Sequence, residues 1–430
     1  MNNLKNLRGT FDLLPDELIK WQNVERIIEE QLFRSSVKEI RTPIIEMTEL
    51  FIRGIGEGTD VVNKEMYTFI DKGERSCTLR PEGTASVARA VLNNGALSNS
   101  KNKLWYIGPM FRYERPQAGR QRQFHQLGVE FIGYESYRSD VEIISLAWDI
   151  LQRLNISELN LEINSLGTHE DRLNFKVEFL RWLKINSEQL DLDSQKKISQ
   201  NPLRILDTKN KNTLKVLENA PRLFDFLSDK SLERYLSIKS ELEFLNIPYK
   251  ENFKLVRGLD YYTHTAFEIN SGDLGSQATV CGGGRYDNLI NQMGGIKTPA
   301  IGFAIGLERL IMLAGKDFEK ERLMDIYIVN KGSLAESIAC DLSRKLRYFD
   351  VLTELDLSGA SFSKQLKKAN KLKARSVIII GDEEANQAQF IIKLFNGNFS
   401  NNQELKLSVS NEKGLENWLN KNLLLNLNSI

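Results

Sequence analysis

Residues 253–269 combine side chains that could hold a small charged substrate. Between two segments rich in Phe, Val, Thr and Ile stand Arg257, Asp260 and the phenols of Tyr261 and Tyr262. An arginine beside a glycine presents a rigid fork of donors to a carboxylate or a phosphate. If the two tyrosines lie on a strand, they point to opposite faces, so one lines a pocket while the other packs. Taken alone, the stretch favours a β-hairpin with a surface Arg–Asp pair.

Residues 80–84, Arg-Pro-Glu-Gly-Thr, form a second candidate site. The proline restricts the backbone and Gly83 permits a tight turn. Glu82 and Thr84 would then present a carboxylate and a hydroxyl side by side, which suits an ammonium group. Alternatively, Thr84 caps a helix over residues 85–93, and both roles can hold at once.

Alternation along residues 124–131 predicts a strand with one polar face. Gln126, Gly128 and Glu130 fall on that face, and the apolar residues between them fall on the other. Because Gly128 has no side chain, it leaves room between the amide and the carboxylate. The pattern therefore resembles the floor of a polar pocket.

The loop before this strand is the densest local basic feature of the chain. Arg112 precedes the loop, which contains Arg115, Gln117, Arg120 and Arg122. A solvated loop is the ordinary explanation for such charge. Arginine and glutamine are also the side chains that reach phosphates and base edges, so a nucleic-acid contact remains open.

Residues 299–310 predict a strand that runs directly into a helix bearing Arg309. Gly302 and Gly306 remove side chains from one face of that strand, where a flat ring could lie. The glycine-rich residues 54–58 are not followed by the Lys-Ser/Thr pair of a P-loop, so we exclude a P-loop nucleotide site.

The composition excludes several classes of protein. The 430 residues carry a net charge of +1, so the chain does not coat nucleic acid by overall charge, although a local basic patch is compatible. Cys77, Cys281 and Cys340 lie far apart and only three histidines occur, which disfavours a zinc site or a disulfide framework. No run approaches the roughly 18 apolar residues of a membrane span, and we expect a cytoplasmic protein without a membrane partner.

The order of predicted elements divides the chain into parts. Residues 39–46 predict a strand interrupted by Pro43, which belongs at a sheet edge and suggests a partner subunit. The β-α-β order near the C-terminus predicts a separate α/β domain with a mixed sheet. The expected organisation is a core over residues 1–167 and 251–320, a helical insertion over residues 168–250, and the C-terminal domain over residues 325–430.

Together these features resemble a known family. Pro43 in its strand, residues 112–130 and residues 302–309 occur in the order of the three motifs of class II aminoacyl-tRNA synthetases. Residues 80–84 and the Arg-Gly-Leu-Asp-Tyr-Tyr run that begins at Arg257 narrow the resemblance to the histidyl-tRNA synthetase family. Two further runs agree: Asn-Pro-Leu-Arg-Ile-Leu-Asp at 201–207 and Gly-Gly-Arg-Tyr-Asp at 283–287. The ordered set spans residues 8–425.

The resemblance implies an α+β fold, with an antiparallel-sheet catalytic core flanked by helices, the helical insertion and a C-terminal α/β anticodon-binding domain. It implies a homodimer formed through the first motif. The expected reaction has two steps. L-histidine and ATP give histidyl-adenylate and pyrophosphate, and histidine then passes to the 3′ end of tRNA(His). Mg²⁺ would accompany ATP and be held mainly by its phosphates, without a dedicated protein metal site.

The resemblance also implies residue roles. Arg112 and Arg257 would be catalytic at the α-phosphate, where cations neutralise charge that develops in the transition state. Arg309, Phe124 and Arg112 would bind ATP. The histidine-binding set would be Glu82, Gly83, Thr84, Arg112, Gln126, Glu130, Arg257, Tyr261 and Tyr262, with Glu130 and Tyr262 on the two imidazole nitrogens. Contacts to the tRNA acceptor end would come from Arg115, Gln117, Arg120 and Arg122.

Two alternatives remain within this resemblance. A histidine-binding relative that regulates ATP phosphoribosyltransferase usually lacks the C-terminal domain and the catalytic arginines, whereas Arg112, Arg257 and Arg309 are present here. Class II synthetases for glycine, proline or threonine share the C-terminal domain type, but the pair Glu130 and Tyr262 speaks against them. His264 stands where many relatives carry Arg or Lys, and we expect only a strand residue there. Cys281 is expected to be buried and inert.

Overall fold

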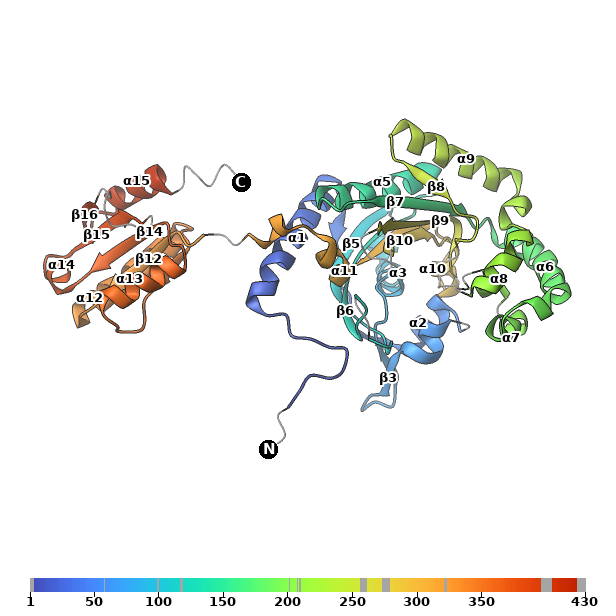
Figure 1. Cartoon of the computed structure of the whole chain (residues 1–430), viewed down its shortest axis with the longest axis horizontal. Helices are drawn as coiled ribbons and strands as arrows, with labels where there is room; N and C mark the ends of the chain where they lie inside the picture. The colour runs from blue at the N-terminus through green and yellow to red at the C-terminus, as the bar shows by residue number, and fades with distance from the viewer. Residues whose placement is uncertain are drawn as a thin grey trace. The chain divides into compact units, whose positions relative to one another are not determined.

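The computed structural model describes residues 4–57, 59–98, 100–116, 119–200, 202–206, 208, 210–255, 261–272, 279–320, 323–395 and 404–423. The chain folds into two compact units, Met1–Lys320 and Glu321–Ile430 (Figure 1). Within the described residues, no helix combines the length and the apolar character needed to cross a bilayer.

The first unit is built on an eight-stranded sheet. Its strand order is β1-β5-β6-β11-β10-β9-β7-β8, antiparallel except for the parallel pairs at the two edges, β1 with β5 and β7 with β8. The strands are β1 (Lys38–Glu39), β5 (Asn102–Phe111), β6 (Gln123–Ile132), β7 (Leu159–Ser165), β8 (Tyr249–Glu251), β9 (Thr263–Ser271), β10 (Thr279–Arg285) and β11 (Ala300–Gly306). The antiparallel core that the sequence predicts is confirmed.

Long helices cover one face of this sheet. Helix α1 (Pro15–Arg34) begins with a proline and two acids, and it buries Trp21, Val24, Ile28 and Leu32 at helical spacing. These side chains and those of α5 (Tyr137–Arg153) join one hydrophobic cluster with the apolar residues of β6. The polar residues of β6 consequently face the other side of the sheet, where α3 (Thr84–Asn93) lies.

A smaller sheet carries the remaining strands of this unit, in the order β2-β4-β3. Strands β3 (Tyr67–Ile70) and β4 (Ser76–Leu79) pair antiparallel. The predicted single strand over residues 39–46 is wrong, because β1 ends at Glu39 in the large sheet and β2 (Ile45–Met47) pairs with β4 in the small one. Pro43 lies between them, where it lacks a backbone donor and restricts the residue before it.

The predicted hairpin over residues 253–269 is also wrong. Residues 253 and 254 form a turn, and β9 begins only at Thr263. Strand β8 pairs with one edge of β7 and β9 pairs with the other. Because β7 lies between β8 and β9, these two strands cannot pair with each other. The other neighbour of β9 is β10, which follows it in the chain and pairs with it antiparallel.

Between β7 and β8 the described residues are helical. The helices are α6 (His169–Ile185), α7 (Leu192–Gln200), α8 (Lys211–Val216) and α9 (Asp229–Phe244), joined by short 3₁₀ turns. Asp171 ties α6 to the start of α9, because its carboxylate accepts hydrogen bonds from the Thr168 and Ser228 amides and from the Ser231 hydroxyl. Shorter helices elsewhere in the unit are α2 (Thr48–Ile55), α4 (Gly95–Ser98), α10 (Leu289–Gln292) and α11 (Leu307–Leu313).

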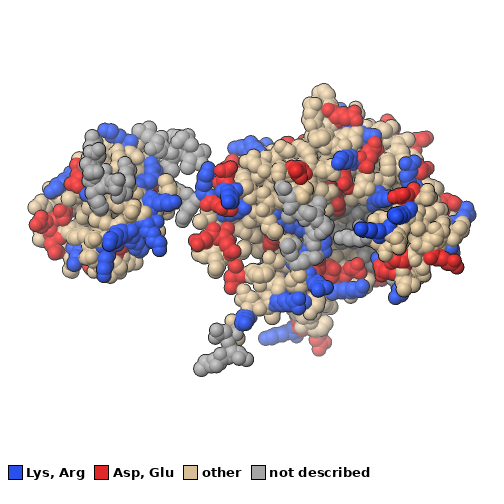
Figure 2. Space-filling view, viewed as in Figure 1, with Lys and Arg blue, Asp and Glu red and all other residues tan. Residues whose placement is uncertain are grey.

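The second unit is a mixed α/β sheet, as the sequence predicts. The order is β13-β12-β14-β15-β16, with the first three strands parallel and the last two antiparallel. The strands are β12 (Ile326–Asn330), β13 (Thr353–Leu355), β14 (Ser376–Ile380), β15 (Gln389–Leu394) and β16 (Glu404–Ser408), and the helices are α12 (Ser333–Tyr348), α13 (Phe362–Lys371), α14 (Asp382–Asn386) and α15 (Glu412–Asn422). Helices α12, α14 and α15 pack on one face and α13 on the other. The exposed lysines Lys364, Lys367 and Lys371 project from α13, and Figure 2 shows Lys and Arg side chains gathered on this unit.

Candidate active site

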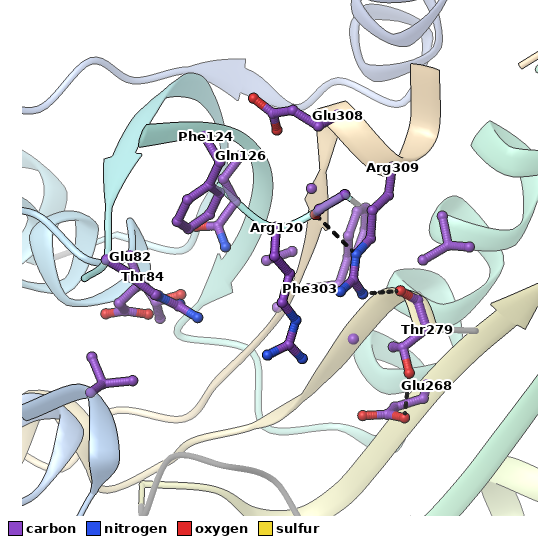
Figure 3. Close-up of a pocket in the computed structure, with 18 of the residues that line it drawn as sticks. Glu82, Thr84, Arg120, Phe124, Gln126, Glu268, Thr279, Phe303, Glu308 and Arg309 are labelled. Carbon is purple, nitrogen blue, oxygen red and sulfur yellow. Dashed lines mark hydrogen bonds between the residues drawn. The ribbon is translucent and has the colours of Figure 1, made fainter. Parts of the chain in front are cut away.

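A cavity of about 450 Å³ opens on the polar face of the large sheet (Figure 3). It brings together most of the residues singled out in the sequence: Glu82, Thr84, Arg112, Arg120, Phe124, Gln126, Glu130, Tyr261, Tyr262 and Arg309 all line it. Gly83 lies against it, with its amide 3.3 Å from Gln126 Oε1. Arg257 and Gln117 lie outside the described residues.

Glu130 lies on the floor of the cavity and is almost completely buried. Its Oε1 accepts a hydrogen bond from the Thr84 hydroxyl at 2.7 Å and lies 3.4 Å from the Tyr106 hydroxyl. Its Oε2 accepts a short hydrogen bond from the Tyr286 hydroxyl. Burial disfavours the ionised carboxylate and raises the pKa of Glu130 to about 8, although these donors partly offset the shift.

The space beside Gly128 is occupied by Tyr106. The two residues are opposite one another in the β5–β6 ladder, and a Cβ built on Gly128 would lie 2.1 Å from Tyr106 Cζ. The predicted room between Gln126 and Glu130 is therefore not open to a ligand. A phenol ring fills it and places its hydroxyl 3.4 Å from the side-chain oxygens of both residues.

Gly302 makes room for the Glu130 carboxylate. A Cβ on Gly302 would lie 1.9 Å from Glu130 Oε2, so the glycine on β11 admits the Glu130 side chain from β6. At Gly306 no atom lies within 4 Å of such a Cβ, and there the cleared face does open on the cavity. Both glycines line the cavity, and a flat ring over this face stays a prediction.

Glu82, and not Thr84, caps helix α3. Glu82 Oε1 accepts a hydrogen bond from the Ala85 amide at 2.7 Å, whereas Thr84 is the first helical residue and donates its hydroxyl to Glu130. The predicted Thr84 cap is therefore wrong. Glu82 Oε2 accepts from the Tyr261 hydroxyl at 3.2 Å, and burial raises the pKa of Glu82 above its usual range.

Tyr261 and Tyr262 both face the cavity. Their ring centroids are 4.7 Å apart, and both side chains are buried. The expectation that they point to opposite faces is wrong, because they precede β9 and strand alternation does not apply to them. The Tyr261 ring also meets the Tyr286 ring edge to face, with centroids 5.7 Å apart.

Arg112 and Phe124 lie next to one another on the cavity wall. Arg112 Nε donates to the Pro81 carbonyl at 2.8 Å, and its guanidinium carbon lies 5.3 Å from the centre of the Phe124 ring. One of its terminal nitrogens is 3.8 Å from Glu114. These contacts hold the guanidinium against the Phe124 ring and beside the loop that carries Glu82.

At the far end of the cavity, Arg309 is held by backbone carbonyls. Its Nη1 donates to the Thr279 carbonyl at 2.8 Å and its Nε to the Gly119 carbonyl at 3.3 Å. The neighbouring Glu308 accepts two bonds from the His125 amide, at 2.8 and 3.0 Å, and so fastens α11 to β6. Figure 3 shows Arg120 projecting between this end and the Glu82 end.

The loop arginines differ in their surroundings. Arg115 is exposed, whereas Arg122 stacks on Tyr113 with the guanidinium 3.8 Å from the ring centre. Arg120 pairs with Glu114 at 3.1 Å. Arg122 therefore packs against the base of the loop, while Arg115 and Arg120 are accessible to a ligand.

His264 and Cys281, which the sequence analysis also singled out, both belong to strands of the large sheet. His264 belongs to β9 with a positive φ of 48°, and burial lowers its pKa, so the ring is neutral near pH 7. Cys281 is completely buried in β10, as expected.

Sequence reasoning missed several side chains that line the cavity or support the residues lining it. Tyr106 and Tyr286 hold Glu130, and Glu268 and Thr279 lie beside Arg309 (Figure 3). Tyr286 belongs to the Gly-Gly-Arg-Tyr-Asp run, which was a usable signal. The others come from strands distant in sequence, and no local pattern marks them. The described part of the chain holds no cluster of three or more His, Cys, Asp or Glu residues that could bind a metal ion.

Comparison with known proteins gives consistent results. A family model described as histidyl-tRNA synthetase matches residues 9–174 and 183–310, and one described as anticodon binding domain matches residues 325–411. A histidine–tRNA ligase of Prochlorococcus marinus (strain MIT 9301) is 74% identical over 99% of this chain and 100% of its own length. That of strain AS9601 is 73% identical over the same shares. The crystal structure of apo S. aureus histidyl-tRNA synthetase has a TM-score of 0.79 and 35% identity, covering 97% of this chain and 99% of that one.

Proposed function

The chain belongs to the histidyl-tRNA synthetase family and is a histidine–tRNA ligase, and we propose that the cavity around Glu130 and Arg112 forms histidyl-adenylate. The enzyme activates L-histidine with ATP and transfers histidine to tRNA(His). The observation that carries the proposal is the two-ended cavity. A buried acidic acceptor lies at one end and a cation held by carbonyls lies at the other, and Arg112 lines the same cavity beside Phe124.

The imidazole of histidine binds at the Glu130 end. Glu130 is oriented by three hydroxyl donors, so its carboxylate is held ready to accept from an imidazole N–H. Tyr262 contributes the second contact to the ring. A pocket built to hydrogen-bond its substrate rejects analogues without those groups by about 10⁴–10⁵-fold. Such a pocket explains specificity for histidine.

The α-amino and carboxylate groups bind nearer the cavity mouth. Glu82 and Thr84, with the Gln126 amide, provide acceptors for the ammonium group, and the Arg112 guanidinium attracts the carboxylate. This places the reacting carboxylate beside Arg112. Arg257, which lies outside the described residues, is proposed to act with Arg112 at the α-phosphate on the strength of the family motif alone.

ATP occupies the Arg309 end. We place the adenine between Arg309 and Phe124, with the triphosphate directed toward Arg112. Mg²⁺ is held mainly by ATP, since Mg²⁺ commonly binds through one or two carboxylates plus substrate phosphates. When bound, it neutralises phosphate charge. Glu268 and Glu114 are the cavity carboxylates able to approach such an ion.

tRNA(His) is proposed to contact both units. The accessible loop arginines Arg115 and Arg120 meet the acceptor end, and Gln117 of the same loop lies outside the described residues. The second unit, which matches an anticodon binding domain, carries exposed lysines on α13 for the phosphates of the anticodon stem. We place the enzyme in the cytoplasm, where translation uses its product.

We also propose that the enzyme is a homodimer through the small sheet. Ile45 and Met47 of β2 and Phe69 of β3 share one face in the β2-β4-β3 register, and all three side chains are exposed. A contiguous exposed apolar face marks an interaction surface. A second copy of the chain is the occupant we infer, because the first family motif includes this region.

Replacing Met47 and Phe69 by lysine is expected to convert the dimer into a monomer, because two charges would then be buried without partners. Analytical ultracentrifugation measures the outcome. Leu192→Lys, which changes a side chain of α7 that is 76% exposed, serves as the control and should leave the dimer intact. A double variant that remains dimeric would place the interface elsewhere.

The pH dependence of kcat/KM for histidine is expected to be bell-shaped. The imidazole of free histidine has a pKa of about 6.5, and the pKa of Glu130 is about 8. The complex holds one proton between these groups. Below the pKa of free histidine, the imidazole carries a second proton that must leave before the complex forms. Above the pKa of Glu130, the carboxyl has lost the one proton that the complex needs. A rate constant that stays flat through pH 8 would contradict this protonation state of Glu130.

ATP–pyrophosphate exchange with each of the twenty amino acids tests the proposed pocket. Exchange should depend on histidine, because a substrate without an imidazole leaves Glu130 without its partner. Efficient exchange with any other amino acid would show that the cavity does not select histidine as proposed.

A further inference from the structure

Two arginines of the helical insertion form hydrogen bonds with residues that hold the walls of the histidine pocket in place. Arg172 of α6 donates through Nη1 to the Tyr262 carbonyl at 2.6 Å. Arg234 of α9 donates through Nη2 to Asp140 Oδ2 at 2.6 Å and through Nη1 to the Glu135 carbonyl at 2.9 Å. Each guanidinium therefore bonds a residue of the catalytic core rather than of the insertion.

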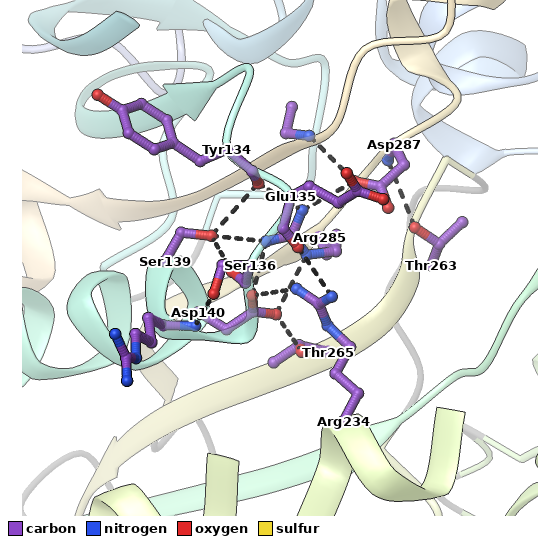
Figure 4. A network of polar contacts seen from close by, with 12 residues as sticks. Tyr134, Glu135, Ser136, Ser139, Asp140, Arg234, Thr263, Thr265, Arg285 and Asp287 are labelled. Carbon is purple, nitrogen blue, oxygen red and sulfur yellow. Dashed lines mark hydrogen bonds and ion pairs between the residues drawn. The ribbon is translucent and has the colours of Figure 1, made fainter. Parts of the chain in front are cut away.

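Asp140 is the centre of a buried polar network (Figure 4). Besides Arg234, its carboxylate accepts from Arg285 Nη2 at 2.6 Å, from Arg285 Nε at 3.2 Å and from the Thr265 hydroxyl. The Asp140 and Arg285 side chains have no exposed surface. Buried ion pairs of this kind have little positional freedom, because displacing either partner leaves a charge uncompensated.

The network fixes the backbone on both sides of Tyr286. Arg285 precedes this tyrosine, and Arg285 Nη1 also lies 3.1 Å from Asp287 Oδ1. The same Asp287 oxygen accepts from the Ala300 amide of β11 at 3.0 Å. With Arg285 and Asp287 both tied down, the Tyr286 hydroxyl is directed onto Glu130.

We propose that Arg172 and Arg234 are positioning residues for histidine recognition, which couple the helical insertion to the imidazole pocket. Arg172 acts through the backbone of Tyr262, and Arg234 acts through Asp140, Arg285 and Tyr286 on Glu130. The inference rests on the proposed function, which places the imidazole between Glu130 and Tyr262. Displacing a binding group by a fraction of an ångström weakens oriented hydrogen bonds, while the distant ATP contacts of Arg309 are unaffected.

Arg172→Met and Arg234→Met test the inference in ATP–pyrophosphate exchange. Methionine keeps much of the aliphatic length and removes the guanidinium. We expect each variant to raise KM for histidine by about tenfold, the scale of one charge-assisted hydrogen bond, and to leave KM for ATP within about twofold. Arg234→Lys, which keeps a cation beside Asp140, should recover most of the histidine affinity.

Arg181→Met is the matched control. Arg181 also lies on α6, but it is 69% exposed and pairs only with Glu178 of its own helix among the described contacts. An unchanged KM for histidine in both test variants would overturn the inference, as would equal rises in both KM values or the same rise in Arg181→Met. If Arg234→Met does not fold, Arg172→Met decides, since it leaves no buried carboxylate unpaired.

Glu130→Gln, measured in parallel, distinguishes a failure of the proposed coupling from a failure of the proposed histidine pocket. If Glu130→Gln raises KM for histidine and the arginine variants do not, the coupling fails and the proposed pocket stands. If Glu130→Gln leaves KM for histidine unchanged, the proposed pocket itself fails.

Discussion

Replacing Glu130 by glutamine is expected to lower kcat/KM for histidine by about 10²–10³-fold, the range found when a pre-oriented group that binds the reacting species is lost. Thr84, Tyr106 and Tyr286 all place hydroxyl groups around this carboxylate, which accepts from them on both oxygens. A glutamine amide keeps a similar shape, but it cannot take up or release a proton, so it cannot share one with the imidazole. The imidazole would also lose its acidic partner.

The effect should be specific to histidine. KM for ATP is expected to stay within about threefold, since Arg309 and Thr279 form the other end of the cavity and do not contact Glu130 in the described contacts. The alkaline limb of the pH profile near 8 should also disappear. Glu268→Gln is the comparison at the other end of the cavity: it removes a charge beside the proposed ATP site, so it should change KM for ATP and leave KM for histidine unchanged. If Glu130→Gln kept wild-type affinity for histidine, the imidazole would have to bind elsewhere.

Replacing Arg112 by alanine is expected to lower kcat for ATP–pyrophosphate exchange by about 10²–10³-fold. Attack of the histidine carboxylate on the α-phosphate brings two anions together, and a cation between them stabilises the charge of the transition state. Arg112 is oriented for this by the Pro81 carbonyl at 2.8 Å and by Phe124. Single-turnover adenylate formation measures the step directly.

Two comparisons make this test specific. Arg112→Lys should recover only part of the rate, because an ammonium lacks the planar fork that can bridge carboxylate and phosphate. Arg115→Ala, on the exposed part of the same loop, should leave exchange unchanged, since exchange does not require tRNA. Near-normal kcat in a folded Arg112→Ala enzyme would remove this arginine from the proposed chemistry.

The positions of the main polar residues follow from local patterns. Alternation in β6 places Gln126 and Glu130 on the cavity face and the apolar residues between them against α1 and α5. The β-α-β order likewise predicts the mixed sheet of the second unit. Such patterns are readable because neighbours along a strand or helix have fixed relative directions.

The order of motifs along the chain was sufficient to recognise the family, and the matches over residues 9–174, 183–310 and 325–411 confirm it. It also singled out Glu82, Thr84, Arg112 and Arg309, which the fold gathers around one cavity. A motif identifies residue types and their order, but it does not specify which atoms meet.

The partners of those residues were decided by the tertiary structure. Tyr106 fills the space beside Gly128 because β5 and β6 pair in one particular register, and Tyr286 reaches Glu130 although the two residues are 156 positions apart in sequence. The stretch at residues 253–269 is not a hairpin, because β7 lies between β9 and the preceding strand β8 in the sheet. Strand order and register depend on burial across the whole sheet, and long-range contacts of this kind leave no periodic trace in the local sequence.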